Sequence, residues 1–144
     1  MKKIFALLFV AIIAFTLAAC DGETETTYED GTYRGVFVDS DGVQVNVQFD
    51  LEDNIVTSAN FRHLAYGGTD YLESEDETTQ GITQQHKDAL EHIVGEDIRE
   101  VLDDLYEPGE LGLDDVDGYS GATIRANKIR SAIVDALNRG VYSY

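Results

Sequence analysis

The sequence predicts an α+β fold in which an antiparallel β-meander is followed by helices in a single domain. Two observations predict it. In the first half of the chain beyond the leader, apolar residues alternate with polar ones, which is the period of a half-buried strand. In the second half, apolar residues recur at intervals of three and four, which is the period of an amphipathic helix. Strands therefore come first and helices after.

The first nineteen residues are predicted to be a lipoprotein signal peptide. Lys2 and Lys3 precede an uncharged apolar run at residues 4–16, which is short of the ~20 residues that a membrane-spanning helix needs. Residues 17–20 (LAAC) resemble the lipobox of bacterial lipoproteins, so Cys20 would carry the lipid and hold the protein on the outer face of the cytoplasmic membrane. A plain signal peptide, with a cysteine at the cut site by coincidence, is the alternative.

The mature chain is strongly acidic. Loss of Lys2 and Lys3 with the leader leaves eight basic residues against 28 acidic ones, a formal net charge of −20. This charge excludes nucleic acid as a partner and favours cationic or neutral partners, although solubility alone could explain it. Because Cys20 is the sole cysteine, its acylation would exclude disulfides, zinc–thiolate sites and Cys-ligated clusters.

A flexible acidic tether is predicted at residues 20–30 and the folded domain at residues 31–144. The connection at 39–42 (DSDG) has turn chemistry, so residues 33–38 and 43–51 should form a β-hairpin. A second turn at 52–54 should lead into a third antiparallel strand, residues 55–64. In the second strand, the side chains expected to face inward are Val43, Val45, Val47 and Phe49.

Beyond the strands, residues 66–81 lack any period and predict a long acidic loop. Three helices should follow. The first has apolar residues at helical spacing from Ile82 to Val94 and ends at Gly95, and the second spans about 98–105 before Pro108. The last is predicted at 122–138, with Gly140 beyond its end.

The segment that carries chemistry lies directly before this last helix, at residues 117–123 (DGYSGAT). Backbone amides in the first turn of a helix have no intrahelical partner and attract an anion such as phosphate. Arg125 and Lys128 are near enough in sequence to neutralise one. The alternative is that Ser120 or Thr123 simply caps the helix.

This segment resembles the D-x-x-S/T-G-A-T flavinylation motif of FMN-binding domains, which occur in the sodium-pumping NADH:quinone reductase, in its Rnf relative and in lipoproteins of extracellular electron transfer. Residues 30–35 (DGTYRG) are similar to the D-G-x-Y-x-G that opens such domains, and residues 131–137 match their Ala-rich helix. The resemblance spans nearly the whole mature domain. Arg125 and Ala126 depart from the usual family continuation, in which hydroxyl residues follow the motif.

The resemblance implies that Thr123 bears FMN through a phosphoester bond, with the motif residues Asp117, Ser120, Gly121 and Ala122 read by a flavin transferase. A threonine hydroxyl is a weak nucleophile, so that modifying enzyme must activate it. By position, Tyr66, Tyr71, Tyr106 and Tyr119 are candidates to contact the flavin ring. The three histidines show no metal-ligand spacing, and the acidic run at 73–77 is interpreted as a solvated loop.

Together these expectations describe a membrane-anchored flavoprotein that relays electrons from a membrane oxidoreductase to an acceptor outside. It would be a carrier rather than a self-contained enzyme, because no nicotinamide-binding motif and no catalytic constellation are present. Two alternatives remain. One is a lipoprotein that binds FMN or another phosphorylated ligand noncovalently, and the other is a surface lipoprotein without a cofactor.

Overall fold

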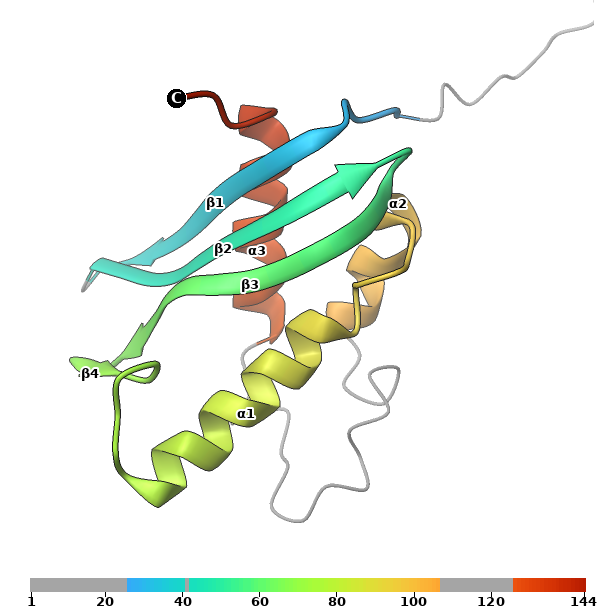
Figure 1. Cartoon of the computed structure of the whole chain (residues 1–144). Helices are drawn as coiled ribbons and strands as arrows, with labels where there is room; N and C mark the ends of the chain where they lie inside the picture. The colour runs from blue at the N-terminus through green and yellow to red at the C-terminus, as the bar shows by residue number, and fades with distance from the viewer. Residues whose placement is uncertain (1–25, 41, 107–125) are drawn as a thin grey trace, which may run out of the picture.

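The computed structural model describes residues 26–40, 42–106 and 126–144, which form one antiparallel sheet and a set of helices (Figure 1). The strands follow one another in the sheet in chain order: β1 (Gly31–Asp39), β2 (Gly42–Glu52), β3 (Ile55–Tyr66) and β4 (Thr69–Asp70). The helical elements come after them: α1 (Glu77–Glu91), α2 (Ile98–Val101), the 3₁₀ helix η1 (Leu102–Tyr106) and α3 (Ala126–Arg139). The predicted α+β fold with a β-meander is confirmed.

Turn chemistry sets the register of the meander. β1 pairs with β2 from Gly31 opposite Leu51 to Asp39 opposite Gly42. The two residues between β2 and β3, Asp53 and Asn54, both have positive φ, of 53° and 66°. A two-residue hairpin turn of this kind matches the twist of the strands that it joins, and Asn and Asp tolerate it better than other side chains.

Val43 of β2, predicted to face the core, lies on the outer face of the sheet instead. Val45, Val47 and Phe49 are fully buried as expected, but Val43 is 42% exposed. Phe37 pairs with Val45 and Val38 with Val43, so Gln44 is an extra residue in a β-bulge. Because the bulge reverses the alternation beyond it, Val43 lies beside Val38 on the outer face of the sheet. The simple period of two therefore fails at this point.

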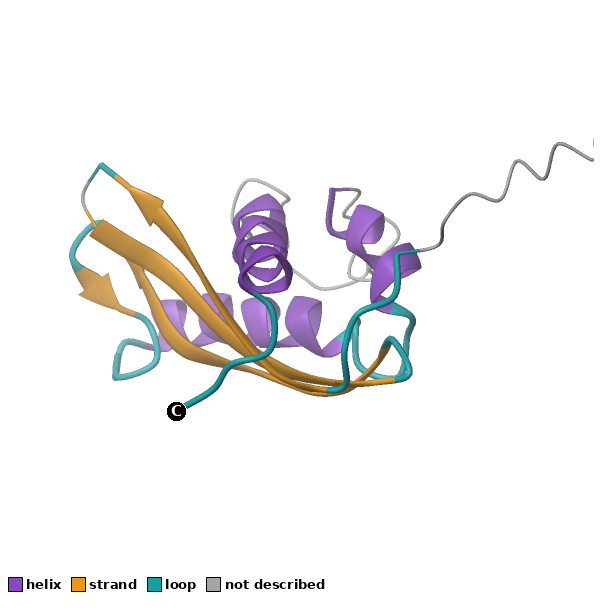
Figure 2. Cartoon of the chain, turned by 90° about the horizontal axis from the view of Figure 1, so that it is seen from above, coloured by secondary structure: helices purple, strands orange, loops and turns teal. Residues whose placement is uncertain are grey.

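The core lies between the sheet and the helices. Figure 2 shows α3 and the short helices on one side of the strands, and α3 contributes Ile129, Ala132 and Ile133 to the fully buried set. On the sheet side, Tyr33 of β1 stacks on Phe49 of β2 with ring centroids 5.3 Å apart. The observed α3 matches the predicted last helix from Ala126 onward, whereas predicted residues 122–125 lie outside the described part of the chain.

The predicted loop at 66–81 is wrong over much of its length. β3 continues to Tyr66, β4 follows, and α1 already begins at Glu77. The cause is an N-cap: the Asp76 carboxylate accepts a hydrogen bond from the backbone N–H of Thr79 at 2.8 Å. This cap satisfies an amide of the first helical turn and sets the start of the helix in a sequence with no apolar stripe there. The predicted second helix is split into α2 and η1.

Residues assigned to the tether in the sequence analysis also contact the domain. The backbone N–H of Tyr28 donates to Asn54 Oδ1 at 2.8 Å, and the Tyr33 hydroxyl donates to the Glu29 carbonyl at 2.7 Å. The Asp30 carboxylate accepts from the backbone N–H of Asp53 at 2.8 Å. Within the described ranges, no helix combines the length and the apolar character required to cross a bilayer.

Candidate functional site

Most of the predicted site lies outside the described residues. This holds for Cys20, for the motif residues Asp117, Ser120, Gly121, Ala122 and Thr123, and for Arg125. The structure does fix the chain on both sides of the motif. η1 ends at Tyr106, and α3 begins at Ala126, three residues after Thr123. The candidate site is therefore built from the side chains around the beginning of α3.

Lys128, in the first turn of α3, is a nearly buried cation. Its residue exposure is 9%, and its ammonium lies 3.6 Å from the Asp39 carboxylate and donates to Gln44 Oε1. The ammonium also lies 5.1 Å from the ring centroid of Phe37 and 5.2 Å from that of Tyr66. A buried ammonium is tolerated only when its charge is balanced and its N–H groups have acceptors. Here the Asp39 carboxylate balances the charge, Gln44 accepts a hydrogen bond, and the two rings offer their negative faces.

The β-bulge explains how Gln44 reaches this position. A regular alternation would place Gln44 on the face opposite Val45, whereas the bulge lets two consecutive residues face Phe37. The side-chain oxygen of Gln44 thereby becomes an uncharged acceptor for Lys128, a residue 84 positions later in the chain. The irregularity in β2 is thus part of the site.

Asp39 is the counterion of this cluster. Its carboxylate accepts a hydrogen bond from the backbone N–H of Ser40 at 2.7 Å, and this bond, together with the nearby Lys128 ammonium, lowers the pKa of Asp39 below its ordinary value. Hydrogen bonds and positive charge favour the ionised carboxylate. Asp39 therefore stays ionised, and pairs with Lys128, at any pH near neutrality.

Tyr66 joins Lys128 to an aromatic cluster, which we define as Tyr66, Tyr71 and His86. The Tyr66 ring lies 5.3 Å from Tyr71 and 5.7 Å from His86, and Tyr71 meets His86 edge-on at 6.2 Å. His86 is fully buried, and its Nδ1 is bonded to the Ile82 carbonyl at 2.8 Å. Since a carbonyl can only accept, Nδ1 carries the proton. The cluster and Lys128 make one continuous set of rings and charge.

Sequence reasoning found part of this cluster. Tyr66 and Tyr71 were candidates to contact a flavin ring, and the structure brings them together. Tyr119 lies outside the described residues, and Tyr106 is the last residue of η1. The sequence predicts no role for His86, yet its position four residues after Ile82 and three before Ala89 places it on the apolar stripe of the helix.

The positive charge of α3 is balanced by carboxylates. Arg130 lies 3.2 Å from Asp103, and Arg139 lies 2.8 Å from Asp135 one turn earlier in the helix. Lys128 is paired with Asp39, as described above. The local excess of basic residues seen in the sequence therefore does not amount to an open cationic surface over the described part of α3. A role for Lys128 in neutralising phosphate stays a prediction.

The other histidines make carboxylate contacts away from this cluster. His92 Nε2 lies 3.0 Å from Asp104, and His63 Nδ1 lies 4.0 Å from Asp70. The acidic run at 73–77 is an exposed loop as far as Asp76, as interpreted from the sequence, and Asp76 in addition provides the N-cap of α1. Across the ranges that the structure describes, no three His, Cys, Asp or Glu side chains gather as they would around a metal ion.

The fold defines the class of protein as a small α+β domain in which α3 and the short helices lie on one side of a β-meander (Figure 2). No protein-family model matches the chain, and no curated protein or solved structure shows significant similarity to it.

Proposed function

We propose that this chain is a membrane-anchored flavoprotein that carries FMN covalently on Thr123. In this role it relays electrons from a membrane oxidoreductase to an acceptor outside the cytoplasmic membrane. The observation that carries the proposal is the sequence DGYSGAT at 117–123, set directly before α3 and similar to the flavinylation motif. Lipid on Cys20 would keep the cofactor near the membrane, because only seven residues separate Cys20 from Tyr28, which already hydrogen-bonds to the domain.

The packing of α3 against β1 supports the family resemblance. Gly35, the last residue of the DGTYRG stretch, lies directly under the Ala-rich part of α3. A Cβ on Gly35 would fall 2.0 Å from the Ala132 carbonyl oxygen and 2.4 Å from the Ala136 nitrogen. The close approach of β1 to α3 thus requires both a glycine at position 35 and small residues on the helix, although about a hundred residues separate them in the chain. The two stretches that accompany the motif in the resemblance form one contact in the fold.

The described residues near the start of α3 have the chemistry that suits a flavin. Flavin sites are commonly lined by apolar and aromatic side chains with a few polar groups. Tyr66 and Tyr71 would contact the ring, and Lys128 would offset part of the acidic field of the protein. FMN, when bound, supplies one- and two-electron transfer, and the protein supplies its position and electrostatics. Asp39 and Gln44 hold the Lys128 ammonium in place.

Mass spectrometry of the full chain, co-expressed with a flavin transferase, tests the proposal. The mass of the native chain should rise by that of FMN less one water relative to expression without the transferase. Thr123→Ala should show no such rise. Thr78→Ala, an exposed threonine on α1, should be modified like the native chain. An unmodified native chain, or a Thr123→Ala variant that still gains the mass, would refute covalent attachment at this residue.

Denaturation separates the alternatives. A phosphoester-linked flavin stays with the polypeptide after unfolding and still fluoresces in a denaturing gel. Flavin that copurifies but is released on unfolding would instead establish noncovalent binding. Colourless protein after co-expression with an active transferase would favour a surface lipoprotein without a cofactor.

A further inference from the structure

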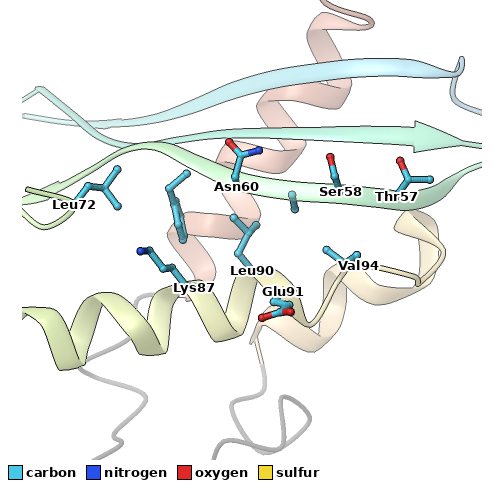
Figure 3. A pocket seen from close by; sticks show the side chains of 10 residues that line it. Thr57, Ser58, Asn60, Leu72, Lys87, Leu90, Glu91 and Val94 are labelled. Atoms are coloured by element: carbon cyan, nitrogen blue, oxygen red, sulfur yellow. The ribbon is translucent and has the colours of Figure 1, made fainter.

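A groove of about 670 Å³ lies between β3 and α1, remote in sequence from the predicted motif (Figure 3). β3 forms its upper wall with residues 57–61, and α1 and the turn after it form the lower wall with Lys87, Leu90, Glu91 and Val94. Leu72 lies near one end (Figure 3). The groove combines apolar side chains with the free edge of a strand.

The chain itself closes the edge of β3 at both ends of this groove. At one end, Val56 donates its N–H to the Glu96 carbonyl at 3.0 Å and accepts from the Gly95 N–H at 2.7 Å. At the other end, the Leu64 carbonyl accepts from the Tyr71 N–H at 2.8 Å. Short pieces of the chain thus occupy the position of a next strand on either side of residues 57–63.

Between these two ends, residues 57–63 of β3 have no neighbouring strand, within the described part of the chain, on the edge away from β2. Among the described residues, none outside the sheet hydrogen-bonds the backbone of residues 57–63. In an antiparallel strand alternate residues direct their N–H and C=O groups to opposite edges, so about half of these groups face the groove. The open stretch spans about 20 Å at roughly 3.3 Å per residue. It therefore has the length and the hydrogen-bonding groups for a short extended peptide.

The shape of the groove favours a single peptide over a second copy of this sheet. Thr57 and Arg62 are the extra residues at two bulges of β3 and have no opposite residue in the β2 register, so the regular part of the edge is only residues 58–61. Bulges twist an edge away from long strand-to-strand pairing. α1 runs beside the same edge (Figure 1), where the sheet of another molecule would collide with it.

Charge indicates the kind of peptide. The lining of the groove holds one acidic and one basic side chain, Glu91 and Lys87, and the segments at its ends add carboxylates, Glu96 at one end and Asp70 of β4 at the other. The whole chain is strongly acidic, with a formal net charge of −18. Complementary charge steers association and selects partners. We propose that the β3–α1 groove binds an extended segment of a partner protein by strand addition, with basic residues flanking alternating apolar ones.

This mode of recognition takes its affinity from main-chain hydrogen bonds and its specificity from side-chain pockets. In this groove, Phe61, Val94 and Leu72 would contact every second side chain of the peptide, and the carboxylates near its ends would meet basic residues. The inference does not depend on the flavin. It concerns residues that the motif does not include, and it should hold equally for Thr123→Ala.

The test uses the mature lipidated protein in detergent micelles and synthetic peptides of about seven residues, matched to the open stretch. The peptides carry lysine at both ends and vary alternate positions among Val, Ile, Leu, Phe and Tyr. Hydrogen exchange should show that the best-binding peptide slows exchange of the groove-facing amides within residues 57–63. Methylating its backbone nitrogens on one edge should weaken binding about tenfold or more, since each lost hydrogen bond reduces affinity several-fold.

Charge-reversal variants complete the test. Glu91→Lys should weaken binding of the lysine-flanked peptide about tenfold, whereas Glu100→Lys, an equal charge change at an exposed residue of α2, should have little effect. Replacing the terminal lysines of the peptide by glutamates should reverse the preference. The proposal is overturned if no peptide of the set slows exchange at residues 57–63, if the methylated peptide binds equally well, or if the two variants behave alike.

Discussion

Replacing Gly35 by alanine would test the contact between β1 and α3 on which the fold depends. The added Cβ would stand 2.0 Å from the Ala132 carbonyl oxygen, 2.4 Å from the Ala136 nitrogen and 2.7 Å from the Ala136 Cβ. The first two are backbone atoms of the helix, which cannot rotate away as the end of a long side chain could. α3 must therefore move, or β1 must bend.

The size of the effect follows from that geometry. Real Cβ contacts are essentially never shorter than 3.0 Å, so α3 has to retreat by about 1 Å at Ala132. A gap of 0.5–1 Å forfeits about a quarter to a half of the dispersion energy of each contact across it. Overpacking usually reduces the free energy of unfolding by about 1–3 kcal/mol. Because the neighbours of Gly35 are rigid backbone atoms, we expect Gly35→Ala to lose about 3 kcal/mol. For a domain of this size that corresponds to a fall in Tm of about 10 °C.

Thermal and urea unfolding, followed by circular dichroism, would measure the change. Gly81→Ala is the matched control because Gly81 lies on an exposed part of α1 and its added Cβ would meet nothing within 4 Å. That variant should be more stable than the native chain by about 0.5–1 kcal/mol, since alanine favours the helix. If Gly35→Ala unfolds at the native temperature, the close packing of α3 on β1 is refuted.

Two further predictions concern charged groups. Hydrogen bonds from the Arg99 side chain, and then from its backbone N–H, lower the pKa of Asp97 to about 2. Because the folded pKa lies below the unfolded value, Asp97 adds stability above about pH 4 that disappears as the pH falls towards 2. The native chain should therefore exceed Asp97→Asn in urea stability at pH 6, and the difference should vanish near pH 2; an unchanged difference would contradict this. In flavinylated protein, Lys128→Met should make the flavin potential more negative, because a buried positive charge that favours the reduced ring is lost. Redox titration measures this potential, and Arg139→Gln, which removes an exposed charge, is the control. Equal shifts of the flavin potential in the two variants would exclude a specific role for Lys128.

Local sequence predicted the elements whose causes are local. The alternation of Val45, Val47 and Phe49 in β2 and the turn at Asp53 and Asn54 depend on neighbours along the chain, and both predictions agree with the structure. The periodicity of α3 likewise indicated its buried face. The start of α1 was missed because a single capping side chain, Asp76, sets it without any apolar periodicity. Val43 was placed on the wrong face because a bulge changes the pairing of whole strands.

For the site, the sequence by itself predicted a motif around Thr123 and a lipobox-like segment before Cys20, because a linear pattern needs no fold to be recognised. Only the tertiary structure decided that Lys128 is buried against Asp39 and Gln44, and that His86 joins Tyr66 and Tyr71. It also decided that residues 57–63 of β3 face a groove. These features join residues far apart in the chain, and such contacts exist only after the sheet and helices pack together.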